Sequence, residues 1–229
     1  MTDVLLFGAY PYVAIAVFLV VSVMRYRSNA FGVSSLSSQF LETRDLFWGS
    51  VPFHLGIIML FFGHLIGFMF PREVLLWNGE PVRLAICELS GLVAALLMLV
   101  GVVLLMVRRL RHRRLRPVTT PLDWVIYTLL CFQVGTGLYI ALNLRWGSDW
   151  YAAVMVPYLR SVFMFQPQVA LIADVKHLSV KLHVLGAFTL FAVFAFSRLM
   201  HVLVAPFPYV WRRMQVVIWN KPRRGAKGA

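Results

Sequence analysis

Five long apolar stretches constrain this chain more than any other feature. They cover residues 4–24, 51–70, 86–107, 124–142 and 182–204. A bilayer core about 30 Å thick is crossed by roughly 20 helical residues at about 1.5 Å rise per residue, and each stretch has that length. Backbone polar groups inside lipid must pair within their own segment, which favours helices. The sequence therefore predicts an all-α integral membrane protein, with residues 1–229 as one domain containing a bundle of five transmembrane helices.

Composition supports this fold class. Of the 229 residues, 60% are hydrophobic and only 14% are charged, which leaves little chain for a soluble domain. The first stretch lacks a basic leading segment and is longer than the apolar region of a typical signal peptide. We therefore expect it to be retained as a helix.

Basic residues are unevenly distributed between the stretches, and this predicts the orientation. Segments 25–50, 108–122 and 198–229 hold 16 of the 22 Lys and Arg residues, six of them arginines between positions 108 and 116. Cytoplasmic loops attract positive charge, so we expect the N-terminus outside, the C-terminus in the cytoplasm and residues 205–229 as a basic cytoplasmic tail. Most of the net charge of +13 then lies on one face, which suits anionic lipids or an acidic partner subunit. The basic runs flank apolar spans, so they do not indicate nucleic-acid binding.

Four histidines lie inside the apolar stretches: His54 and His64 in the second, His183 and His201 in the fifth. Ionisable side chains at membrane depth are costly and are typical of functional sites. If the two helices run antiparallel, equal depth pairs His64 with His183 on the outer side and His54 with His201 on the inner side. Eighteen residues are five helical turns of about 3.6 residues, so we expect His183 and His201 on one helix face.

Pairs of histidines at matched depth predict two haem groups stacked between the second and fifth helices. Neutral imidazole binds haem iron, and two imidazoles fill both axial positions, which favours electron transfer. The chain has two cysteines, Cys87 and Cys131, and no C-x-x-C-H motif, so we expect non-covalent haem b and no iron–sulfur cluster in this chain. Arg198, three residues before His201, either contacts haem propionates or is an ordinary interfacial arginine. Gly56, like the neighbouring glycines at 63 and 67, admits either a flat macrocycle or close helix packing.

Several segments together resemble the gamma subunit of respiratory nitrate reductase, a membrane cytochrome b. They are residues 10–12, 37–39, 53–57, 62–64, 181–183, 196–201 and 209–217. The resemblance covers nearly the whole chain. The spacing of the four histidines is its most specific part, whereas the apolar residues between them are not specific.

The resemblance implies a subunit of a three-subunit enzyme in the bacterial cytoplasmic (inner) membrane. The subunit oxidises menaquinol or ubiquinol near the outer face, with His64 and His183 on the outer haem and His54 and His201 on the inner haem. Electrons then pass to an iron–sulfur beta subunit and a molybdenum-containing alpha subunit on the cytoplasmic side, and the alpha subunit reduces nitrate to nitrite.

The resemblance also implies a quinol site beside the outer haem. It would contain Gly63, His64 and Arg83, the last at a place where family members have a lysine. An arginine orients and polarises a quinol oxygen but does not give up a proton, which leaves His64, a water or Glu88 to handle protons. The aromatic-rich loop 144–176 is either an interfacial belt or a lid over this site.

Two further histidines lie outside the apolar stretches. For His112, within the arginine-rich segment, we expect a solvated or lipid-contacting side chain. For His177 we favour a surface role over help in releasing quinol protons.

Alternatives remain open from the sequence. The same cytochrome b module could serve another partner, such as a sulfur-compound reductase or a nitrite oxidoreductase, and only the partner subunits distinguish these. A haem-free proton-coupled transporter would use the histidines as proton relays, and a purely structural anchor would need none of them. An absorbance spectrum with and without reductant separates the haem protein from the transporter.

Overall fold

The computed structural model describes residues 1–28, 33, 37–144 and 146–204. Within these ranges every regular element is helical and no strand occurs. The expected basic tail 205–229, which includes residues 209–217 of the resemblance, lies outside the described residues.

The long helices extend the apolar stretches at their ends. They are η1 Val4–Ala9 continuing into α1 Tyr10–Ser28, α2 Arg44–Met69, α4 Pro81–Arg111 and α5 Pro121–Asn143. By length and composition these form four segments able to cross a membrane. The fifth apolar helix, α9 Leu178–Phe194, has 17 residues.

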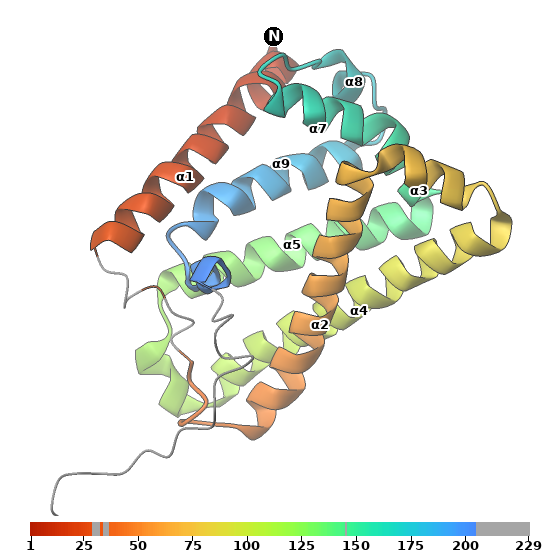
Figure 1. The fold of residues 1–229 in the computed structure, drawn as a ribbon. Helices are drawn as coiled ribbons and strands as arrows, with labels where there is room; N and C mark the ends of the chain where they lie inside the picture. The colour runs from red at the N-terminus through yellow and green to blue at the C-terminus, as the bar shows by residue number, and fades with distance from the viewer. Residues whose placement is uncertain (29–32, 34–36, 145, 205–229) are drawn as a thin grey trace, which may run out of the picture.

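Short helices gather at the two ends of the bundle (Figure 1). They are α3 Pro71–Asn78, η3 Arg113–Val118, α6 Gly147–Trp150, η4 Tyr151–Met155, α7 Val156–Phe163, α8 Ala170–Ala173 and η5 Arg198–Val204. We call the end formed by residues 70–80, 144 and 146–177 the loop end. We call the opposite end, formed by residues 37–48, 108–124 and 198–203, the basic end.

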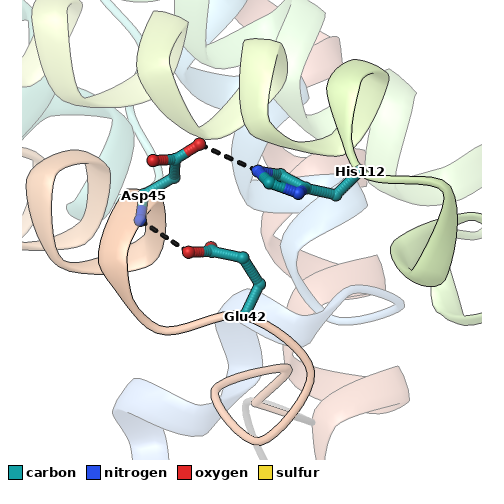
Figure 2. Close-up of side chains that lie close together, drawn as sticks. All are labelled: Glu42, Asp45 and His112. Carbon is teal, nitrogen blue, oxygen red and sulfur yellow. Dashed lines mark hydrogen bonds and ion pairs between the residues drawn. The ribbon is translucent and has the colours of Figure 1, made fainter.

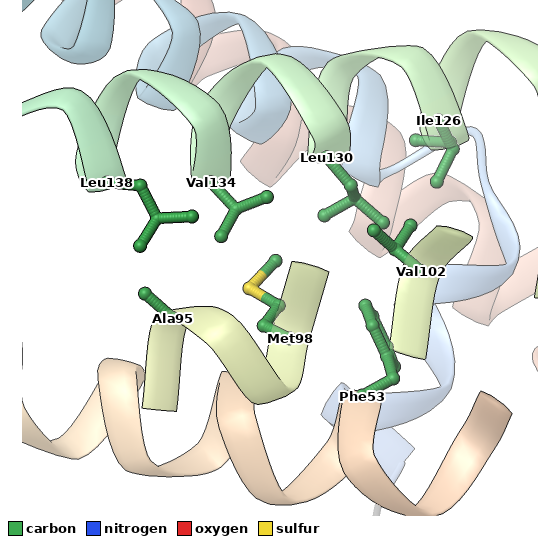
Figure 3. Packing of buried hydrophobic residues seen from close by; sticks show 8 residues of the cluster. All are labelled: Phe53, Ala95, Met98, Val102, Ile126, Leu130, Val134 and Leu138. Carbon is green, nitrogen blue, oxygen red and sulfur yellow. The ribbon is translucent and has the colours of Figure 1, made fainter. Parts of the chain in front are cut away.

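Neighbouring helices form a continuous series. In Figure 1, α2 lies along α4, α4 contacts α5, α5 contacts α9, and α1 packs on the other side of α9. The four α5 residues Ile126, Leu130, Val134 and Leu138 recur every four positions and are all buried. This spacing puts them on one face of the helix, which packs against α4 and Phe53 of α2 (Figure 3). A second core lies under the loop end around Phe7, Tyr158, Val162, Ile172 and Val180.

Glycines allow α2 and α4 to touch backbone to backbone. A Cβ atom on Gly56 would lie 2.5 Å from the carbonyl oxygen of Ala94, and one on Gly101 would lie 2.3 Å from the backbone nitrogen of Phe53. Helix packing therefore explains Gly56. Gly63 differs, because a Cβ there would meet nothing within 4 Å.

The last apolar stretch does not form the single helix expected over 182–204. Helix α9 begins at Leu178 and ends at Phe194, and His201 lies on the separate helix η5. Nη1 of Arg25 on α1 donates hydrogen bonds to the carbonyl oxygens of Ala195 (2.6 Å) and Ser197 (3.1 Å). The guanidinium of Arg25 thus binds the carbonyl oxygens at the break between α9 and η5. The expectation that His183 and His201 share one face of one helix was wrong.

Candidate functional site

The structure pairs the four membrane histidines. The ring centroids of His64 and His183 are 6.5 Å apart with their planes inclined by 30°. Those of His54 and His201 are 6.4 Å apart with the planes inclined by 67°. Both pairs are those expected from antiparallel depth, although His201 reaches its place from η5. The first pair lies toward the loop end and the second toward the basic end.

Both separations suit a metal ion between two imidazoles. A metal–imidazole nitrogen bond is about 2 Å long, and a ring nitrogen lies about 1.1 Å from its ring centre, so two rings on opposite sides of one metal have centroids about 6 Å apart. The spacing of each pair is close to this value. The donor set, two neutral nitrogen ligands, also fits haem iron.

Hydrogen bonds set the protonation of three of the four rings. Nδ1 of His54 lies 2.7 Å from the carbonyl oxygen of Ser50, and Nδ1 of His64 lies 2.8 Å from that of Leu60. Nδ1 of His201 lies 2.7 Å from the carbonyl oxygen of Arg198. A carbonyl only accepts, so each Nδ1 carries a hydrogen, and in the neutral ring the lone pair is then on Nε2. Metal-binding histidines are typically oriented in this way.

His183 is held by side chains of α5 instead. Its Nδ1 lies 3.0 Å from Oγ1 of Thr136, and the side-chain nitrogen of Gln133 lies 3.2 Å from both ring nitrogens. Sequence reasoning missed both partners, because contacts between α5 and α9 are long-range in the chain.

Residues of the loop end contact the second half of α2 at His64, Phe68 and Met69. The hydroxyl of Tyr151 donates to the carbonyl oxygen of His64 at 3.0 Å, and the two rings meet edge to face with centroids 5.2 Å apart. Burial raises the pKa of Tyr151 to about 12, so its hydroxyl remains a donor at neutral pH. Arg160 donates to the carbonyl oxygens of Phe68 and Met69. Tyr151 and Arg160 of the loop 144–176 therefore contact His64 and the end of α2.

Arg83 and Glu88, the other two residues considered for the quinol site, make different contacts in the structure. The Arg83 guanidinium lies over the Trp77 ring, 5.2 Å from its centroid, and its buried Nε has no hydrogen-bond partner among the described residues. Oε1 of Glu88 accepts from the backbone nitrogen (2.8 Å) and hydroxyl (2.6 Å) of Ser148, so this carboxylate anchors the start of α6. None of these contacts joins Arg83 to His64.

His177 is exposed, as expected for a surface residue. It lines, with Lys176, a groove of about 560 Å³ between α5 and α9.

Two arginines of the basic run are turned into the protein. Arg108 is 2% exposed, and its Nε lies 2.5 Å from Oε2 of Glu42. Arg109 is also buried and bonds the hydroxyls of Tyr127 and Thr119. These two arginines are therefore bonded inside the protein and do not contribute to the exposed charge expected to meet lipid or a partner. The remaining four, Arg111, Arg113, Arg114 and Arg116, are exposed.

His112 is ion-paired rather than simply solvated. Its Nε2 lies 2.8 Å from Oδ2 of Asp45, beside Glu42 (Figure 2). Ligand atoms of these three residues lie within 4.8 Å of one another, which is compatible with a metal ion. However, Glu42 already accepts from the backbone nitrogens of Asp45 and Leu46 and from Arg108. Burial alone would raise the pKa of Glu42, but these hydrogen bonds outweigh it and hold the pKa below its usual value. The cluster is therefore explained as a helix-capping ion-pair network.

Arg198 is bound to the start of α5. Its Nε lies 2.9 Å from Oδ1 of Asp123, and its Nη2 donates to the carbonyl oxygen of Val118. Sequence reasoning missed Asp123. The available signal was the segment 120–123, whose Thr and Asp form a capping box at the start of α5.

Comparisons with known proteins agree with this architecture. The sequence profile described as nitrate reductase gamma subunit matches residues 3–220. The chain belongs to the nitrate reductase gamma subunit family. The nitrate reductase gamma chain of Bacillus subtilis is 30% identical over 224 residues, covering 96% of this chain and 99% of the relative. The respiratory nitrate reductase 1 gamma chain of Escherichia coli is 33% identical over 213 residues, covering 92% and 95%. The respiratory nitrate reductase 2 gamma chain of the same organism is 31% identical over 218 residues, covering 94% and 96%.

Membership confirms the resemblance inferred from the sequence. The chain is a membrane subunit of a nitrate reductase complex, and the family implies a cytochrome b that assembles with alpha and beta subunits. Its four long apolar helices agree with a multi-pass membrane protein.

Proposed function

We propose that this gamma subunit is a dihaem cytochrome b that oxidises membrane quinol and supplies electrons for nitrate reduction. The observation that carries the proposal is the pair of imidazole spacings, 6.4 and 6.5 Å, at two depths of the same bundle. His64 and His183 would hold one haem b toward the loop end, and His54 and His201 the other toward the basic end. Bound there, haem would supply one-electron transfer.

The chain's own residues would bind the quinol beside His64. Gly63 leaves open space next to this histidine, and Tyr151 covers its ring. The unpartnered Nε of Arg83 is a donor for a quinol oxygen, since guanidinium stays protonated and orients rather than deprotonates. The protons would go to a water, because Nδ1 of His64 is bonded to the carbonyl oxygen of Leu60, its Nε2 would be held by the haem, and Oε1 of Glu88 already holds Ser148. The loop 144–176 would act as the lid.

Orientation follows from the distribution of charge. The basic end carries the exposed arginines of residues 111–116, so we place it on the cytoplasmic side of a bacterial inner membrane, in contact with anionic lipids. There it would meet the iron–sulfur beta subunit and the molybdenum-containing alpha subunit. Arg198 would contact the propionates of the haem at this end. Quinol protons would leave at the loop end while electrons move inward. Moving one elementary charge across the membrane corresponds to about 2.3 kcal/mol per 100 mV of membrane potential.

Haem counts in the purified complex test the proposal. We expect reduced-minus-oxidised spectra of H64A or H183A to show loss of one b haem, and H54A or H201A to lose the other. The loop-end variants should also lose quinol oxidation while the complex still reduces nitrate with an artificial donor. H177A is the matched control for haem content, because this histidine is exposed and should leave both haems.

Two results would overturn parts of this proposal. A wild-type chain without b-type absorbance would favour the proton-coupled transporter. Haem without molybdenum in the copurified subunits would favour another partner, such as a sulfur-compound reductase or a nitrite oxidoreductase.

A further inference from the structure

We propose that Thr136 is a positioning residue that fixes the tautomer of His183 and tunes the redox potential of the loop-end haem. The inference rests on the proposed function, because it requires a haem at the pair of His64 and His183. Thr136 is on α5, which lies between α4 and α9, and α9 carries His183.

The hydrogen bonds of Thr136 determine the direction of its contact with His183. Oγ1 of Thr136 lies 2.9 Å from the carbonyl oxygen of Phe132 and 3.0 Å from that of Gln133. Both carbonyls can only accept, so the single hydroxyl hydrogen is directed to them. A lone pair of Oγ1 therefore faces Nδ1 of His183, 3.0 Å away. Nδ1 donates to Thr136, so in the neutral ring Nε2 has the lone pair that a metal would take; in this structure the side-chain nitrogen of Gln133 lies 3.2 Å from it.

Neighbouring α5 residues leave no other acceptor for this hydrogen. The side-chain nitrogen of Gln133 is 3.2 Å from Nδ1, but an amide nitrogen only donates. Gly137 offers no side chain, and a Cβ there would lie 3.1 Å from Cε1 of His183. Positions 133, 136 and 137 share one helix face, so α5 holds the edge of the ring. In the structure Gln133 faces the ring with its amide nitrogen, so Thr136 is the residue of these three whose acceptor lies next to Nδ1.

This arrangement differs from that of the other three ligands. Their Nδ1 atoms donate to main-chain carbonyls, which no substitution removes. At His183 the acceptor is a hydroxyl. An acceptor at Nδ1 raises the electron-donating strength of a metal-bound imidazole and so favours the more oxidised iron. Removing it should raise the midpoint potential of that haem.

Redox titration and electron paramagnetic resonance of the purified complex provide the test. We expect T136V to keep both haems, to shift the loop-end midpoint potential upward and change its ferric spectrum, and to leave the basic-end haem unchanged. A tenfold change in the balance of oxidised and reduced haem corresponds to about 59 mV for one electron. T136S keeps the hydroxyl and should match the wild type. T189V is the matched control, since Thr189 on α9 bonds Tyr10 and the carbonyl of Leu185 instead.

Each outcome has a definite meaning. An unchanged potential and spectrum in T136V overturns the role of Thr136, while wild-type protein without haem overturns the proposed function instead. If T136V loses the loop-end haem, T136S decides: wild-type properties support the positioning role, and a shifted potential or lost haem overturns it. A shift in T189V equal to that in T136V also overturns it.

Discussion

The carboxylate of Asp123 binds two arginines and the backbone at the start of α5. It is 8% exposed, bonds Nε of Arg198 through Oδ1, and lies 3.6 Å from Nη1 of Arg109 through Oδ2. Oδ2 also accepts from the backbone nitrogen of Thr120 at the start of α5. Because Arg198 begins the helix that carries His201, this residue links α5 to the basic-end histidine pair.

We predict that D123N destabilises the protein and weakens the basic-end haem first. Removing one charge of a buried ion pair leaves its partners uncompensated, at a cost of about 3–5 kcal/mol. Thermal unfolding in detergent measures the loss, and spectra show which haem is depleted. D174N is the control, because Asp174 is exposed. Equal depletion of both haems in D123N would contradict the local link.

At the level of elements, the close contact between α2 and α4 depends on glycines, which have no side chain. Gly101 of α4 lies against the backbone of Phe53, the residue before His54. Gly91, on the same helix, has open space where a Cβ would be. The two positions therefore separate helix packing from intrinsic helix propensity.

G101A should lower stability, whereas G91A should not. Overpacking a close contact costs about 1–3 kcal/mol, while alanine in a helix gains up to about 1 kcal/mol over glycine. Unfolding temperatures of the two variants in one detergent provide the comparison. Equal stability of G101A and G91A would show that α2 can move away from α4 without cost.

For the whole molecule, polarity along the bundle is the organising feature. The basic end contains buried ion pairs and exposed arginines. The short helices α3, α6, α7 and α8 lie at the opposite end (Figure 1), where Tyr151 bonds the carbonyl oxygen of His64. This polarity predicts which end docks the catalytic partners.

Replacing the four exposed arginines at 111, 113, 114 and 116 by glutamine should weaken copurification of the partner subunits and leave the haem content intact. The loss should be largest at low ionic strength, where exposed charges are least screened. Neutralising Arg72 and Lys176, both exposed at the loop end, is the control. Weaker copurification in the control alone would reverse the proposed orientation.

Residue chemistry made the histidine pairing predictable. Equal depth in antiparallel helices selects the same partners that the structure brings together. The break after Phe194 was not predictable, because Arg25 meets the carbonyls of Ala195 and Ser197 from a helix far away in the chain. The contact between Thr136 and His183 was not predictable either, because these residues are on different helices far apart in the chain.

The sequence by itself determined the helical membrane class and the histidine partners, because apolar length and depth are properties of each segment alone. Only the tertiary structure decided which arginines are buried, where the last helix ends and which side chain supports His183. Those outcomes depend on hydrogen bonds and ion pairs between segments distant along the chain, and local sequence does not encode them.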